Sequence, residues 1–160
     1  MPKFLISETI HSEKVETVRG GTTSVKHGYK ENGKAVKLST LDNYVLAAAG
    51  DRIEAIQVTS NLDTQGTVDG YAIIGVVGTG YKSVTFDGLQ ATPGTGVVAA
   101  GDYVVVGTVV AAGTALTGPL KVTKATDQAT ASTAAYKARV VSLGTAGTGA
   151  VGTTGIIKLF

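Results

Sequence analysis

A chain of 160 residues, 43% of them hydrophobic, is long enough to bury a core of its own, which excludes wholesale disorder. A net charge of +2 is too small to indicate a nucleic-acid or membrane partner, and the absence of cysteine excludes disulfides and cysteine-based zinc sites. The 22 glycines and the many Thr and Val residues favour strands and turns over helices. The sequence therefore predicts an all-β protein, a single β-sandwich or barrel domain with a polar N-terminal arm.

The first 37 residues form the predicted arm, and residues 38–160 form the predicted β domain. The arm holds seven of the fourteen Lys and Arg residues but few large apolar ones. Its first 14 residues lack the apolar stretch of a secretory signal. Asn32-Gly33 is a strong hairpin-turn signal. Two interpretations stay open: an arm that becomes ordered on a partner, and an edge hairpin of the same domain.

Short apolar runs alternate with turns from residue 36 onward, at the spacing of a sandwich or barrel. Residues 44–49 fit either a helical turn or a strand, and Gly107 is expected to bend the Val-rich run around it. Residues 97–116 carry one charge, Asp102, but their three glycines favour short strands over a membrane span. The expected strands are residues 36–38, 53–58, 71–77, 81–86, 103–110, 120–122, 138–143 and 155–160.

One short pattern occurs twice in the chain. Residues 48–53 read AAGDRI, and residues 99–104, 51 positions later, read AAGDYV. The repeat indicates either two similar turn–strand units within one domain or independent use of Gly-Asp at the entry of a strand, and the second interpretation is preferred. The unequal spacing of the residues that follow each copy excludes a regular solenoid.

No residue pattern indicates catalysis, so we predict that the protein is not an enzyme and binds no cofactor or metal. Residues 75–83 nearly match a phosphate-binding loop, but Tyr81 separates the last glycine from Lys82, and a strand is expected to follow. Residues 147–152 read G-x-G-x-x-G, but only eight residues follow them. Both stretches are interpreted as turns. His11 and His27 lie in the polar arm, 16 positions apart, and make a poor metal site.

Several segments resemble the decoration, or cement, proteins on the heads of tailed bacteriophages. They are LSTLDNYVLAAAGDRIEAIQV (residues 38–58), DGY (69–71), GVV (75–77), GDYVVVGT (101–108), KARVVSLGT (137–145) and the closing residues 152–160. The resemblance covers about residues 36–160 and rests on turn and strand residues rather than on a chemical signature. It implies a structural protein of the virion that binds the outer surface of the capsid and stabilises contacts between capsomers.

The same resemblance implies the major capsid protein as partner and a homo-oligomer, a trimer in preference to a dimer. The protein is not expected to bind nucleic acid or a membrane. The expected capsid or oligomer contacts are Phe4, Leu5, Ile6, Ile156, Ile157, Leu159 and Phe160. For the four C-terminal residues, burial in the core is the preferred alternative. Alternative functions are a head-fibre base, a tail-associated β protein, or a carbohydrate-binding β-sandwich, although six Tyr, three Phe and no Trp leave few residues for stacking on sugars.

Overall fold

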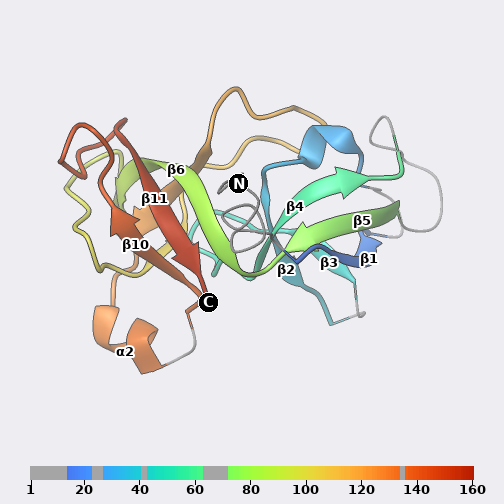
Figure 1. Ribbon diagram of the computed structural model, residues 1–160, viewed down its shortest axis with the longest axis horizontal. Coiled ribbons are helices and arrows are strands. Elements are labelled where there is room, and N and C mark those ends of the chain that lie inside the picture. Colours follow the sequence, from blue (N-terminus) through green and yellow to red (C-terminus); the bar gives the residue numbers. More distant parts are fainter. Residues whose placement is uncertain (1–13, 23–26, 41–42, 63–71, 134–135) are drawn as a thin grey trace, which may run out of the picture.

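A computed structural model describes residues 14–22, 27–40, 43–62, 72–133 and 136–160. Nearly all of its regular structure is strand, which confirms the predicted all-β class. The strands form a closed barrel and a curled sheet that lie side by side, and β6 runs from one to the other (Figure 1). One long core joins the two units, as expected for a single domain.

The N-terminal unit is a closed barrel with the strand order β1-β3-β2-β4-β5. It closes because β1 pairs antiparallel with β5 over five residues, from Glu16 opposite Val76 to Gly20 opposite Ala72. A 3₁₀ helix, η1 (Tyr29–Glu31), precedes β2. The strands are β1 (Glu16–Gly20), β2 (Ala35–Leu38), β3 (Tyr44–Leu46), β4 (Ala55–Ser60) and β5 (Ala72–Val77). Val36, Ala55, Ala72, Ile74 and Val76 fill the interior of the barrel.

The C-terminal unit is a curled sheet with the order β10-β11-β6-β9-β8, to which β7 adds on β6. The pair β6–β9 is parallel and the others are antiparallel. Its edge strands approach one another, since Tyr103 forms an isolated bridge with Arg139. The strands are β6 (Gly80–Leu89), β7 (Thr92–Pro93), β8 (Val104–Val106), β9 (Leu120–Lys124), β10 (Ala138–Ser142) and β11 (Thr154–Leu159). A short helix, α2 (Gln128–Thr133), links β9 to β10.

The main core crosses the junction between the two units. Ile53 and Ile56 from the barrel pack in one cluster with Phe86, Val122 and Ile157 from the sheet, and all five side chains are buried. Full burial of an Ile or Phe side chain stabilises a fold by about 1.5–3 kcal/mol. The two units therefore share one buried apolar core, and the barrel and the sheet stabilise one another.

The first 37 residues contribute directly to this fold where the structure describes them. The expected boundary at residues 37 and 38 falls inside β2, and β1 is a barrel strand. The Asn32-Gly33 turn is present, with Gly33 at a φ of 87°, but it joins η1 to β2 instead of joining two paired strands. Residues 1–13 and 23–26 lie outside the described residues.

Two expected strand ends differ from the structure, one near Asp87 and one near Gly107. The strand expected over residues 81–86 does not end at Phe86, because β6 continues to Leu89. Within this extension, the Asp87 carboxylate accepts the backbone N–H of Thr108 at 2.8 Å. The chain leaves the sheet at Gly107, which packs so closely on β9 that a Cβ there would lie 3.0 Å from the backbone of Lys121. The Val-rich run at residues 103–110 is therefore a strand only in β8.

Candidate functional site

The alternation of β11 divides the expected C-terminal contact residues into two sets. Ile157 and Leu159 point into the main core and are 0% and 1% exposed. Ile156 and Phe160 point outward and are 39% and 53% exposed. The preferred alternative, core burial, thus describes half of the set, and the other half is accessible to a partner. Phe4, Leu5 and Ile6 lie outside the described residues.

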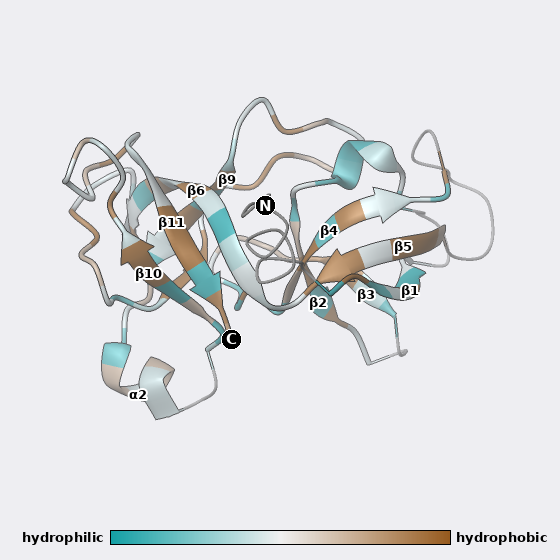
Figure 2. Cartoon of the chain, in the orientation of Figure 1, coloured by the Kyte–Doolittle hydropathy of each residue, from teal (hydrophilic) through white to brown (hydrophobic). Residues whose placement is uncertain are grey.

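The outward residues belong to a larger apolar and basic surface on the sheet, which we call the outer β11 face. Strand register places Lys158 beside Tyr81 on β6 and beside Arg139 on β10. The Lys158 ammonium lies 5.7 Å from the centroid of the Tyr81 ring and 4.9 Å from that of Phe160. Figure 2 shows hydrophobic and hydrophilic residues together on these three neighbouring strands. The outer β11 face comprises Tyr81, Arg139, Val141, Ile156, Lys158 and Phe160.

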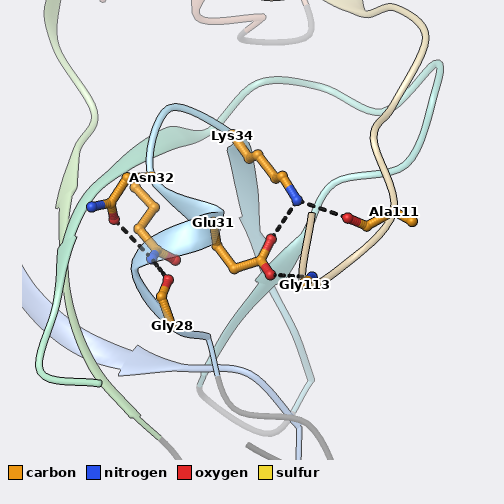
Figure 3. A network of polar contacts seen from close by, with 7 residues as sticks. Gly28, Glu31, Asn32, Lys34, Ala111 and Gly113 are labelled. Carbon is orange, nitrogen blue, oxygen red and sulfur yellow. Dashed lines mark hydrogen bonds and ion pairs between the residues drawn. The ribbon is translucent and has the colours of Figure 1, made fainter. Parts of the chain in front are cut away.

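A second unusual feature is a buried ion pair at the junction between the barrel and the loop that follows β8 (Figure 3). The Lys34 ammonium lies 2.6 Å from the Glu31 carboxylate, and the two side chains are 6% and 0% exposed. Lys34 also donates to the carbonyl of Ala111 at 2.9 Å, and the Gly113 N–H donates to Glu31 at 2.5 Å. Each charge is therefore paired and hydrogen-bonded, as burial requires. The pair fastens the β8–β9 loop to the barrel.

Two further buried polar side chains, His27 and Gln57, lie beside this pair. Gln57 donates its amide hydrogens to the carbonyl of Gly28 at 3.0 Å and to the side chain of Asn32 at 3.1 Å. Burial lowers the pKa of His27, although the Glu31 carboxylate and the Gln57 side chain act in the opposite direction. The imidazole is therefore neutral at pH 7.

The lowered pKa of His27 predicts a loss of stability in mild acid. The unfolded imidazole titrates near its ordinary value of 6.5, so below that pH the unfolded state binds a proton more readily than the folded state does. The free energy of unfolding falls as the pH drops through 6.5, and the loss is complete below the folded pKa. We expect His27→Gln to flatten this dependence between pH 7.5 and 5, measured by urea unfolding. Equal slopes for the variant and the wild type would contradict the prediction.

The two Ala-Ala-Gly-Asp repeats form the same turn. The Asp51 carboxylate accepts the N–H of Ala48 at 2.7 Å, and the Asp102 carboxylate accepts that of Ala99 at 2.8 Å. The third residue of each turn is a glycine at positive φ, 84° and 91°, which other residues rarely adopt. Each aspartate also pairs with a lysine, Lys37 at 2.6 Å and Lys124 at 2.9 Å. The sequence repeat is therefore a repeat of structure as well.

Each turn also joins two parts of the fold through paired backbone hydrogen bonds. Gly50 donates to the carbonyl of Val106 at 2.8 Å, and Val106 donates back to Asp51 at 3.0 Å, which ties the barrel to β8. In the second turn, Gly101 donates to Val140 at 2.8 Å, and Val140 donates back to Asp102 at 2.9 Å. These two hydrogen bonds hold the turn before β8 against β10.

We expect alanine at either turn aspartate to lower the free energy of unfolding by about 1–2 kcal/mol, because a backbone N–H and a lysine lose their partner. Asp51→Asn and Asp102→Asn keep an acceptor oxygen, so they are expected to cost less than the alanine variants. Thermal unfolding of the four variants checks this. An unchanged melting temperature for both alanine variants would show that the turns do not depend on these carboxylates.

The structure also bears on the motifs that could carry chemistry. Gly152, with a φ of 86°, lies in the connection before β11, as expected for a turn. Residues 75–83 belong mostly to β5 and β6, which are joined at residues 78 and 79, and Gly80, with a φ of 97°, is the first residue of β6. Among the described residues, no three His, Cys, Asp or Glu side chains gather as metal ligands would. No helix in the described ranges is both long and apolar enough to cross a membrane.

The comparisons with known proteins are negative. No family model, curated protein or solved structure matches the chain. The sites described above therefore rest on the geometry of this chain alone.

Sequence reasoning missed the buried pair and found only part of the outer β11 face. Glu31 and Lys34 stand three positions apart, a spacing that could have signalled an ion pair, but their contacts with Ala111 and Gly113 depend on the tertiary fold. The alternation of residues 81–86 could have placed Tyr81 outward, because Val84 and Phe86 are the apolar members of the opposite face.

Proposed function

We propose that this protein is a structural decoration protein of a tailed-bacteriophage head, which binds the outer surface of the capsid and stabilises contacts between capsomers. The resemblance over about residues 36–160 supports the family. The observation that carries the proposal is an all-β body whose two units are held together by several contacts and which exposes apolar side chains on one sheet face. Such a body suits binding to a surface rather than chemistry on a small substrate.

A protein that bridges capsomers must resist deformation, because packed DNA pushes the shell outward. Three connections hold the barrel and the sheet together: the shared core, the Gly50–Val106 backbone pairing and the buried Glu31–Lys34 pair. A load applied to one unit is therefore transmitted to the other. Each copy needs only a standard interface, about 800 Å² per partner, because linked copies that bind neighbouring subunits gain avidity well beyond the affinity of one contact.

The proposed partner is the major capsid protein, with a homo-oligomer, trimeric in preference to dimeric, as the bound form. A contact role for Phe4, Leu5 and Ile6 is part of the proposal, because an extended arm can add a strand to a neighbour through backbone hydrogen bonds. Removal of residues 1–10 is expected to weaken binding to the shell, and unchanged binding would exclude the arm.

Copy number in purified virus particles tests the proposed function. Quantitative mass spectrometry would compare this chain with the major capsid protein of the virus that encodes it. A symmetric decoration protein is expected at between about one-third and one copy per capsid subunit, because closed symmetry fixes the ratio. A handful of copies would instead indicate a fibre or tail component, and absence from the particle would refute a virion role.

A further inference from the structure

We infer that the outer β11 face is the docking surface of this protein and that its partner is an acidic protein surface with apolar side chains among its carboxylates. The inference rests on the proposed function, since it names the face that would meet the capsid. It adds the chemistry of the partner, which neither the fold nor the resemblance specifies.

The apolar part of the argument is the clustering of large exposed side chains on one side of three adjacent strands. Tyr81, Val141, Ile156 and Phe160 are 53%, 42%, 39% and 53% exposed. The pairing of β10, β11 and β6 brings these side chains onto neighbouring strands of one sheet. Single exposed apolar residues are common on soluble proteins, but a cluster of them marks an interaction surface. Aromatic side chains and arginine are also the residues that contribute most to binding at protein interfaces.

The charged side chains on this face have one sign. Lys158 and Arg139 lie opposite one another on β11 and β10, and the exposed Lys121 lies on β9, the next strand beyond β6. Among the described residues, no carboxylate lies within ion-pair distance of Lys158 or Arg139. Lys158 instead contacts the rings of Tyr81 and Phe160, and Arg139 contacts the ring of Tyr103 at 5.6 Å.

The acidic residues of the C-terminal unit are engaged elsewhere. Residues 72–160 contain six Lys and Arg residues but only three aspartates. Asp87 binds Thr108, Asp102 pairs with Lys124, and Asp127 accepts the N–H of Thr130 at the start of α2. The positive charge of the outer β11 face is therefore not neutralised from within the unit. Carboxylates on the partner would neutralise this positive charge, and apolar side chains between them would cover Ile156 and Val141.

Binding to shells stripped of decoration protein tests the inference. The chain would be mixed with such shells, sedimented, and its dissociation constant measured at low and high salt. We expect Lys158→Glu and Ile156→Thr each to weaken binding at least tenfold, and the double variant more, since central interface residues often contribute 2 kcal/mol or about 30-fold. Wild-type binding is expected to weaken as salt screens the charges.

Matched controls on the barrel separate this face from a general change in charge or hydrophobicity. Lys30→Glu reverses a charge in η1, and Ile73→Thr removes a 54% exposed isoleucine from β5. Both are expected to bind within about threefold of the wild type, the spread of typical neutral contacts. Urea unfolding of every variant would establish that the fold is retained.

The outcomes distinguish the inference from the function on which it rests. If the wild type binds shells and the double variant binds equally well, the outer β11 face is not the docking surface, while the proposed function stands. If the barrel controls lose as much affinity as the face variants, the inference fails in the same way. If the wild type does not bind stripped shells, both proposals are overturned.

Discussion

Replacing Glu31 by Gln is expected to lower the free energy of unfolding by about 3–5 kcal/mol, because it leaves the Lys34 ammonium buried without a counter-charge. The change also weakens the acceptor of the Gly113 N–H and so loosens the β8–β9 loop. Lys34→Met is expected to be similarly costly, since it leaves the Glu31 carboxylate buried without its cation. Urea unfolding at pH 7 measures both effects.

A double-mutant cycle measures the coupling free energy between Glu31 and Lys34. The double variant Glu31→Gln/Lys34→Met removes both charges and is expected to be more stable than either single variant, because no unpaired charge stays buried. Glu16→Gln is the matched control, since Glu16 pairs with Lys14 at the surface at 3.6 Å and should cost less than about 1 kcal/mol. Simple additivity of the two single effects would contradict the account of a coupled buried pair.

Replacing Gly149 by Ala is expected to destabilise the protein by about 3 kcal/mol or more, at the upper end for an overpacked site. A Cβ at Gly149 would overlap the carbonyl oxygen of Val98, and its backbone carbonyl already accepts the Val98 N–H at 2.9 Å. Val98 cannot easily shift away from Gly149, because its side chain is 0% exposed in the main core. The loop between β10 and β11 must therefore move away from the sheet.

Gly118→Ala is the matched control for that substitution. A Cβ at Gly118 meets no atom within 4 Å, and its backbone does not adopt a positive φ. We expect the control to stay within about 0.5 kcal/mol of the wild type, as surface changes usually do. Thermal unfolding compares the two variants. Equal melting temperatures would mean that the loop does not pack against Val98 as described.

Local patterns in the sequence predicted much of the secondary structure. Short apolar runs between turns located β4, β5, β6, β10 and β11. These features depend on neighbours in sequence, so periodicity and turn residues reveal them. The helix α2 was not indicated, since it is short and held by the Asp127 side chain rather than by an apolar stripe.

Contacts between distant residues could not be predicted in the same way. The parallel pairing of β6 with β9 and the closure of the barrel by β1 depend on tertiary contacts that no local pattern records. The polar composition of residues 1–37 suggested an arm, but part of that polarity is buried and paired, as in Glu31 and Lys34. For the site, alternation along β11 separates Ile156 from Ile157, whereas the meeting of Lys158 with Tyr81 requires the strand register.

Electron cryomicroscopy of intact virus particles tests the central claim most directly. The account predicts density on the outer surface of the capsid, repeated with the symmetry of the shell, into which the barrel and the curled sheet fit. The outer β11 face should lie against capsid carboxylates. Density for this chain only at a tail or a fibre, or a capsid surface with no such density, would contradict the proposed function.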